Sequence, residues 1–286
     1  MIYFSSRIHI IIIKWNLHFF LSIFCSINLS FSQLILEEIN LPKTINETSG
    51  IEYHDNHLIT FNDSGNDPVL FYLNLKGEII KTRIIVDINN NDWEDIAMDD
   101  KYLYVADIGN NYDTRDNLSI IKIPKNQNLD SFELINFNYP EQKSFKYRKL
   151  SMFDAEGLIS IDDYLLIFTK NRAKKITDIY RLPKTPGNYN AKKIGSLNTE
   201  SIITGADFDK SSNLLALTST ISFNEYYLLI IDNFSIENKD DYKIKMYEIP
   251  VGKTQVEGIK IINSSTFWLT SEQEKKGDPK LFKIKI

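Results

Sequence analysis

The chain has 286 residues, of which 43% are hydrophobic and 25% charged, and its formal net charge is −5. This composition is typical of a globular protein that is long enough to bury a large core. The negative charge argues against a nucleic acid as partner, because nucleic acids are bound through clustered Lys and Arg.

Residues 1–32 have the three parts of a secretion signal. Arg7 and Lys14 are the only charged residues there, an apolar run covers residues 17–27, and small residues precede a cleavage point near Ser32. We therefore predict a secreted, periplasmic or cell-envelope protein with no membrane span after cleavage. An uncleaved membrane anchor is the alternative, because residues 8–13 extend the apolar stretch.

Cys25 is the single cysteine and lies inside this segment. After cleavage the protein would contain no disulfide, thiolate nucleophile or cysteine metal site. An exported protein without disulfides favours a bacterial envelope as its source.

The remaining residues, 33–286, carry an internal repeat, which we interpret as one domain. A small or acidic pair followed by a large apolar residue recurs five times, and the apolar positions are 45, 62, 50 and 51 residues apart. These five anchors are Ser49-Gly50-Ile51, Glu94-Asp95-Ile96, Glu156-Gly157-Leu158, Ala206-Asp207-Phe208 and Glu257-Gly258-Ile259.

Each anchor starts a series of short apolar runs with the length and alternation of β-strands. After the first anchor these runs cover residues 57–63, 69–73 and 79–86, and similar runs follow the other anchors. No segment has sustained helical periodicity. The sequence therefore predicts an all-β propeller of about five four-stranded blades. Six blades are the alternative, because the longest interval leaves room for two more strands around residues 140–151.

The fifth repeat ends at Ile286 before a fourth strand can form. Residues 34–41 precede the first anchor and have the length and alternation of that missing outer strand. We predict that they complete the last blade, which would protect its open edge.

The propeller geometry places the anchors and the ends of the second strands at one end of the central channel, because paired strands run antiparallel. Several carboxylates would converge at this mouth, and oxygen ligands of this kind suit calcium or another divalent cation. The alternative is that acids at blade starts bind backbone amides of the next blade. The candidate metal ligands are Glu94, Glu156, Glu257, Asp95 and Asp207.

The ends of the second strands supply further polar groups at the mouth. Lys170 and Arg172 occupy the place that Asp63 and Asp107 take in other repeats, and these cations either orient an anionic ligand or pair with neighbouring acids. The candidate ligand-binding residues are Asn62, Asp63, Asp107, Asn110, Lys170, Arg172 and Glu272.

Other chemistries find little support in the sequence. His54 and His57 are the only histidines after residue 32, and they flank the predicted turn Asp55-Asn56 at the opposite end of the first two strands. A histidine zinc site or a Ser-His-Asp triad at the mouth is therefore not expected. Trp93 is expected to pack between blades.

The ordered motifs resemble those of a family of exported bacterial propeller proteins, largely uncharacterised. The similarity spans residues 45–272, and the propeller fold is what it implies. More distantly, the Glu-Gly anchors are similar to those of gluconolactonase-type propellers and phytase-like esterase domains, which implies a divalent metal at an acidic mouth. Gluconolactonase-type anchors continue with proline, where this chain has Leu158 and Ile259. The motifs that carry the resemblance are Glu47–Ile51, Phe61–Asn66, Asn91–Ala97, Asp107–Asn111, Asp154–Leu158, Phe168–Lys170, Thr204–Asp207 and Val256–Ile259.

From these features we expect a monomeric binding or interaction protein that holds a small molecule or a protein ligand at the channel mouth. The competing hypothesis is a metal-dependent hydrolase of a lactone, ester or phosphate, in which the mouth glutamates act as metal ligands or general base.

Overall fold

The computed structural model describes residues 33–126, 131–222, 225–237, 242–273 and 277–286. The predicted signal, its cleavage near Ser32 and Cys25 lie outside these ranges. Within them, no helix has the length and apolar character needed to cross a membrane.

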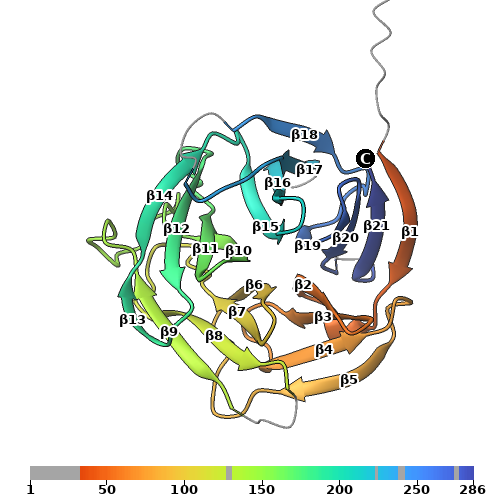
Figure 1. The fold of residues 1–286 in the computed structure, drawn as a ribbon, viewed down its shortest axis with the longest axis horizontal. Coiled ribbons are helices and arrows are strands. Elements are labelled where there is room, and N and C mark those ends of the chain that lie inside the picture. The colour runs from red at the N-terminus through yellow and green to blue at the C-terminus, as the bar shows by residue number, and fades with distance from the viewer. Residues whose placement is uncertain (1–32, 127–130, 223–224, 238–241, 274–276) are drawn as a thin grey trace, which may run out of the picture. The chain divides into compact units, whose positions relative to one another are not determined.

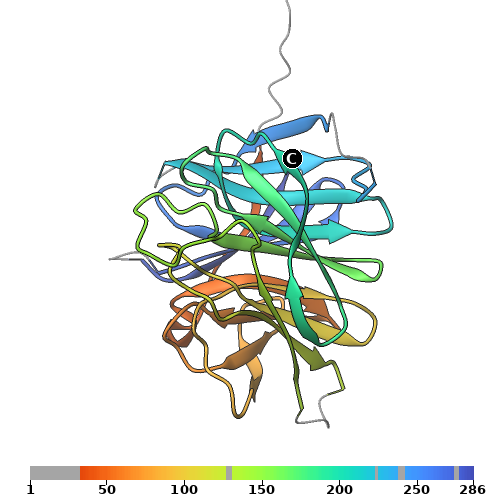
Figure 2. The ribbon, with the colours of Figure 1, turned by 90° about the vertical axis from the view of Figure 1, so that its left-hand side faces the viewer.

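The described chain forms five sheets of at least four strands each, arranged around a central axis (Figures 1 and 2). The innermost strands contact one another in a closed order, β2, β6, β10, β15, β19 and again β2. This is the predicted five-bladed, all-β propeller. Residues 140–151 form turns and bends rather than strands, so the six-blade alternative is wrong.

Each blade leads outward from the axis through four strands. The innermost strands are β2 (Thr48–His54), β6 (Trp93–Met98), β10 (Ala155–Ile161), β15 (Ile202–Asp209) and β19 (Val256–Asn263). The second strands are β3 (His57–Asn62), β7 (Tyr102–Asp107), β11 (Tyr164–Thr169), β16 (Leu214–Ser222) and β20 (Thr266–Ser271). The third strands are β4 (Val69–Leu73), β8 (Leu118–Pro124), β12 (Thr177–Pro183), β17 (Glu225–Ile231) and β21 (Lys280–Lys285). The outer strands are β5 (Ile79–Ile84), β9 (Glu133–Asn138), β14 (Lys192–Leu197), β18 (Ile244–Glu248) and β1 (Leu34–Asn40).

Two short elements complete the described fold: a 3-10 turn, η1 (Lys43–Ile45), and a strand, β13 (Gly187–Asn190). β13 pairs in parallel with β9 and so covers the outer edge of the second blade. β13 was not predicted from the sequence, because its residues, Gly-Asn-Tyr-Asn, have no apolar alternation.

Apolar side chains fill the spaces between adjacent blades. Trp93 is fully buried between the first and second blades and meets Phe61 edge to face, with ring centroids 5.6 Å apart. This confirms the expected packing role of Trp93. His54 and His57 flank a tight turn in which Asp55 and Asn56 have positive φ, also as expected.

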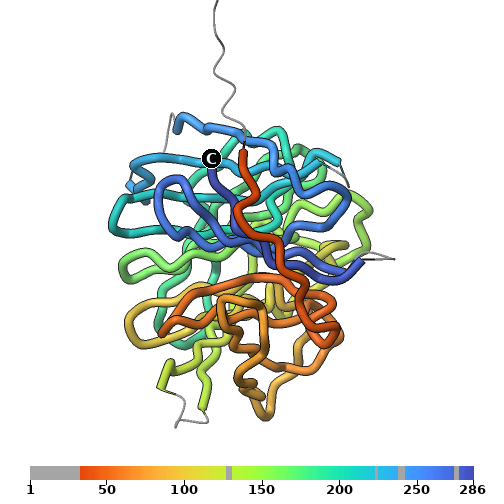
Figure 3. Tube along the Cα trace, turned by 90° about the vertical axis from the view of Figure 1, so that its right-hand side faces the viewer, coloured from red at the N-terminus to blue at the C-terminus, as the bar shows by residue number. Residues whose placement is uncertain are grey.

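The first and last parts of the described chain close the ring together. β1 pairs antiparallel with β21, with Ile39 opposite Leu281, and Figure 3 shows the two segments side by side. Ile39 packs against the apolar cluster that contains Leu41 and Ile51. The predicted closure is therefore confirmed, and β1 covers an edge that β21 would otherwise expose.

A β-bulge interrupts the pairing of the first two strands in every blade. It lies just after the start of the innermost strand, where one extra residue turns toward the channel. Five equivalent residues follow from this register: Ser49, Glu94, Glu156, Thr204 and Glu257, which we call the first ring.

The fourth blade corrects the repeat alignment. Its bulge lies between Ile203 and Gly205, so Thr204, rather than Ala206, is the equivalent of the glutamates. Asp207 lies three residues further along β15 than Thr204. The sequence repeat was misleading here because Gly205-Ala206 imitates the small pair of the other anchors.

The residues that follow the first ring meet at the narrowest level of the channel. Four of the five blades have glycine there, and a Cβ on Gly50 would lie 2.6 Å from the Asp95 carboxylate. Asp95, in the second blade, is the exception. Its carboxylate accepts hydrogen bonds from the backbone N–H groups of Ile96 (2.8 Å) in its own blade, Leu158 (2.8 Å) in the third blade and Ala206 (3.2 Å) in the fourth. One acid thus ties three blades together where four glycines leave it room.

The closure by β1 is testable with two substitutions in that strand. Ile39→Ala removes a packed side chain and is expected to lower the free energy of unfolding by about 1–2 kcal/mol. Leu34→Ala, at a largely exposed position of the same strand, should change it by less than about 0.5 kcal/mol. Chemical denaturation of the two variants checks this, and equal effects would contradict the docking of β1.

Candidate functional site

A second set of equivalent positions lies beside the first ring at the channel mouth. In four blades the backbone N–H of this residue donates to a carbonyl just before the innermost strand, as from Asp63 to Glu47 (2.8 Å) and from Lys170 to Asp154 (2.7 Å). In the fourth blade, Thr220 pairs with Ile202 at this level. The second ring comprises Asp63, Ile108, Lys170, Thr220 and Glu272.

Three of the predicted ligand residues belong to the second ring, and a fourth does not. Asp63, Lys170 and Glu272 belong to the ring, whereas Ile108 occupies the position expected for Asp107. Asp107 pairs with Trp93 one residue earlier and is buried. The predicted equivalence of Asp107 with Lys170 is therefore off by one residue.

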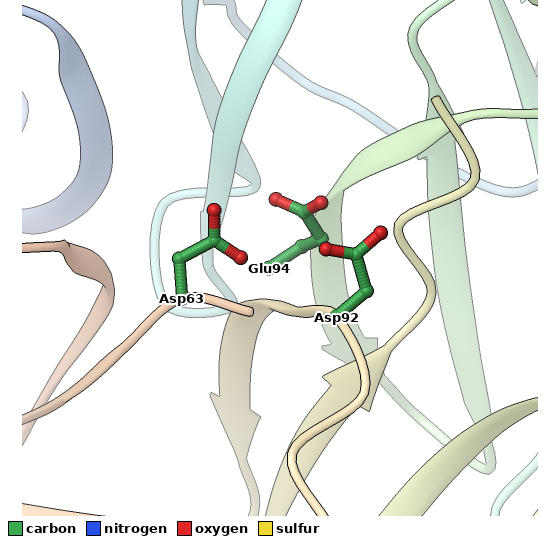
Figure 4. A group of neighbouring side chains, drawn as sticks. All are labelled: Asp63, Asp92 and Glu94. Atoms are coloured by element: carbon green, nitrogen blue, oxygen red, sulfur yellow. The ribbon is translucent and has the colours of Figure 1, made fainter. Parts of the chain in front are cut away.

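Three carboxylates come together between the first and second blades. Asp63, Asp92 and Glu94 each place a carboxylate oxygen within 4.8 Å of the others, and Figure 4 shows the three groups turned toward a common space. Oxygen atoms at such separations are suited to surround one hard cation such as Ca²⁺. Among the described residues, this is the one group of acids or histidines with this spacing.

Neighbouring side chains hold the triad in place. Asn90 donates to the backbone carbonyls of Asn62 and Asp63 (both 2.8 Å) and accepts from the N–H of Trp93 (3.0 Å), so it joins the two blades that carry the triad. Gly109 is required for the close approach of the next loop, because a Cβ there would lie 2.2 Å from both the Asp92 and the Glu94 carboxylates.

Asp107 holds the backbone of Asp92 in position. Its carboxylate accepts hydrogen bonds from the backbone N–H of Asp92 (3.0 Å) and the side chain of Asn91 (2.6 Å), and it pairs with Arg115 (2.7 Å). Arg115 also approaches the Asp92 carboxylate at 4.0 Å. Asp107 thus supports the triad without lining the cavity.

The third blade brings two cations to the same mouth. Lys170 forms an ion pair with Glu156, and Arg172 pairs with Asp154 at 2.8 Å and donates to Asn111. Burial disfavours a charged lysine, but the carboxylates of Glu156 and Glu257 outweigh it and raise the pKa of Lys170. Both cations are therefore engaged with neighbouring acids, one of the two roles predicted for them.

Between the rings lies a cavity of about 380 Å³. Its acidic side is made by Asp63 and the glutamates of the two rings, whereas the fourth blade contributes an uncharged wall. This wall comprises Ile202, Thr204, Thr220, Ile221, Ser222 and Tyr226.

The mouth acids lose their protons less readily than exposed carboxyls. Burial and then repulsion by Asp92 raise the pKa of Asp63 to about 7, and burial raises that of Asp92 to about 6 despite Arg115. Burial, with repulsion by Asp63 and Glu156, raises the pKa of Glu272 to about 8. The pKa of Glu94 rises well above its usual value for the same reasons. A bound cation would oppose these shifts.

Deeper in the channel, Asp207, one of the predicted metal ligands, belongs to a buried ion cluster. Lys260 pairs with Glu52 (2.6 Å) and Asp207 (2.9 Å), and the other Asp207 oxygen accepts from the N–H of Ile261 (2.7 Å). Asp207 and Asp95 are therefore both satisfied by protein donors below the mouth, as the amide-binding alternative predicted.

The two predicted asparagine ligands also have structural partners. Asn62 donates to the carbonyl of Thr44 (2.8 Å), and Asn110 accepts from the N–H of Arg115 (2.9 Å) while its own N–H donates to Asp154 (2.7 Å). They organise the loops behind the mouth.

Sequence reasoning missed Asp92 and Asp154 as site residues. Each lies two positions before a glutamate of the first ring, so the second and third repeats share the pattern Asp-x-Glu. That shared spacing was the available signal. Lys260 and Glu52 were missed because a pairing between the first and fifth blades, far apart in sequence, leaves no local pattern.

Comparison with known proteins supports the fold. No protein family model matches the chain, and no curated protein matches it by sequence. An aldose sugar dehydrogenase of Streptomyces coelicolor, solved in its PQQ-bound form, is similar in structure with a TM-score of 0.51 and 10% identity, over 89% of this chain and 98% of that one. An exo-β-1,3-galactanase of Phanerochaete chrysosporium, solved with β-1,3-galactotriose, gives a TM-score of 0.53 and 10% identity, over 88% of this chain and 64% of that one. At such identities the similarity extends to the propeller fold alone.

The role of Asp95 between blades is testable. Asp95→Asn replaces one of two accepting oxygens by a donor. In either orientation of the amide its NH2 group faces a backbone N–H, of Ile96 or of Leu158 and Ala206, so the free energy of unfolding is expected to fall by at least about 2 kcal/mol. Any stabilisation by calcium should persist in the variant. Thermal unfolding with and without calcium checks both, and the loss of the calcium effect at unchanged stability would contradict the assignment.

The raised pKa of Glu272 predicts a pH-dependent effect of Glu272→Gln. Between the unfolded pKa near 4.5 and the folded value of about 8, the folded state holds the extra proton, so the wild type loses stability as pH rises through this window. At pH 5 the variant should resemble the wild type. At pH 9, in calcium-free buffer, it should be more stable by about 1–2 kcal/mol, which corresponds to a melting temperature 2–8 °C higher. A difference that does not change with pH would contradict the shift.

Proposed function

We propose that this protein is an extracytoplasmic binding protein whose channel mouth holds a divalent cation, with calcium as the first candidate, and a ligand beside that cation. The observation that carries the proposal is the convergence of Asp63, Asp92 and Glu94 at the edge of a cavity of about 380 Å³. A cavity of this size suits a small molecule or one side chain of a protein ligand.

The chemistry of the triad favours a hard cation. Its ligands are carboxylate oxygens alone, which suit calcium better than a soft metal. The pKa values of Asp63 and Asp92, about 7 and 6, mean that protons compete with the cation below neutral pH. Calcium binding should therefore weaken as pH falls toward 5.

Export is part of the same proposal. The signal composition of residues 1–32 and the resemblance of residues 45–272 to exported bacterial propellers support it. Calcium at the concentrations found outside cells suffices for sites of modest affinity.

A metal-dependent hydrolase is the second candidate. It is favoured by the raised pKa values of Asp63 and Glu272, about 7 and 8, because a general acid or base works best near the ambient pH. The two structural neighbours are enzymes with unrelated chemistries, so the fold does not decide between binding and catalysis. Turnover of a panel of lactones, esters and phosphate esters, lost in Glu94→Gln, would favour the hydrolase.

Calcium should stabilise the wild type through the triad. At a calcium concentration one hundred times the dissociation constant, the expected gain is about 2.7 kcal/mol. Asp92→Asn removes a ligand and should abolish most of this gain. Thermal unfolding with calcium and with a chelator measures both.

Asp162→Asn is the matched control, because Asp162 is an exposed acid in the β10–β11 turn, at the opposite end of the strands from the mouth. It should keep the full calcium effect. If Asp92→Asn also keeps it, calcium binds elsewhere and the proposed site is wrong.

A further inference from the structure

The side of the mouth away from the triad contains unsatisfied polar groups. Glu156 is 5% exposed, and one of its carboxylate oxygens pairs with Lys170 while the other finds no hydrogen-bond partner among the described residues. Thr204 is 2% exposed, and its hydroxyl also finds no hydrogen-bond partner among the described residues. Both residues line the cavity, and a buried polar atom without a partner points to a missing ligand group.

The charge of the cavity selects the kind of ligand. Its lining contains five carboxylates and two cations, and Lys170 and Arg172 are already paired with acids. The lining is therefore rich in acceptors and poor in free donors. An anionic ligand would be repelled, whereas a cation with N–H groups would satisfy the acceptors.

The glutamates on this side of the mouth are spaced differently from the triad. Burial raises the pKa values of Glu156, Glu257 and Glu272, and repulsion by Glu156 raises those of Glu257 and Glu272 further. They do not, however, meet the 4.8 Å spacing of ligand atoms that the triad meets, within the part of the chain that the structure describes. All three line the same cavity, so their carboxylates can receive the N–H groups of one organic cation.

The fourth blade supplies an apolar surface next to these acids. Ile202, Ile221 and Tyr226 line the cavity there. An organic ammonium group has both required parts, a charged head for the glutamates and a hydrocarbon body for this wall.

We propose that the mouth binds a primary amine: its ammonium group lies among Glu156, Glu257 and Glu272, and its carbon chain lies on Ile202 and Tyr226. The inference rests on the mouth being the binding site proposed above, but it does not involve the calcium ligands. A free polyamine and the lysine side chain of a partner protein share this chemistry.

Isothermal titration calorimetry with 1,4-diaminobutane tests the proposal on the calcium-loaded protein. 1,4-Butanediol has the same carbon chain without charge, and succinate has the opposite charge. The diamine is expected to bind at least tenfold more tightly than either. Equal or tighter binding of the diol would show that the mouth selects hydroxyl groups, and would overturn the proposal, as would tighter binding of succinate. N-acetyl-lysine methylamide in place of the diamine separates the two sources: binding of similar strength favours a protein lysine.

Variants locate the binding. Glu257→Gln with Glu272→Gln should weaken diamine binding at least tenfold while calcium still raises the melting temperature, which also shows that the variant folds. Glu37→Gln with Glu38→Gln, two exposed acids on β1, is the matched control for non-specific attraction and should bind the diamine normally. Unchanged binding in the Glu257/Glu272 variant would overturn the assignment.

These variants test the calcium site and the amine site independently of each other. Asp92→Asn should lose the calcium effect and keep diamine binding, because Asp92 is not among the residues that line the cavity. If calcium competes with the diamine and Asp92→Asn loses both, the diamine occupies the triad and the separate amine site is wrong. If the wild type responds to calcium but not to the diamine, the further inference fails and the proposed function stands.

Discussion

The close approach of five strands at one axis determines the architecture of this protein. At the narrowest level four blades have glycine, and a Cβ on Gly205 or Gly258 would meet a backbone carbonyl oxygen of the neighbouring blade at 2.1 or 2.5 Å. The single side chain at this level, Asp95, accepts amide hydrogen bonds from the third and fourth blades. Because this level is fixed, the preceding residue of each blade lies at the mouth, and that position forms the first ring.

The two rings have different compositions around the axis, and this asymmetry gives the mouth its chemistry. The first and second blades bring three carboxylates together, the third adds Lys170 and Arg172, and the fourth is uncharged at the equivalent positions. A purely structural role would favour the same residue in every blade. Ion pairs and hydrogen bonds hold the loops behind the mouth; for example, the Asp107 carboxylate accepts a hydrogen bond from the backbone N–H of Asp92. The acids at the mouth are therefore held in place before any ligand binds.

Much of the fold could be predicted from sequence, because strand alternation and the repeat are local patterns. The blade number, the closure by residues 34–41 and the packing of Trp93 all follow from them. The site was predicted less well. A bulge shifts the strand register by one residue, and no sequence pattern marks it. For this reason the prediction missed Thr204 as the equivalent residue of the fourth blade, and it assigned to Asp107 the position that Ile108 occupies. Asp95 and Asp207 show a further limit. These acids, one and three residues beyond the first ring, find amide and lysine partners on neighbouring blades, and only the three-dimensional arrangement reveals them.

An experimental crystal structure of the protein grown with a calcium-mimicking lanthanide tests the central claim most directly, because anomalous scattering locates the ion independently of any assumption about its ligands. We expect a single strong peak at the mouth, from an ion bonded to carboxylate oxygens of Asp63, Asp92 and Glu94. A peak elsewhere, or none at the mouth with these carboxylates well ordered, would contradict it.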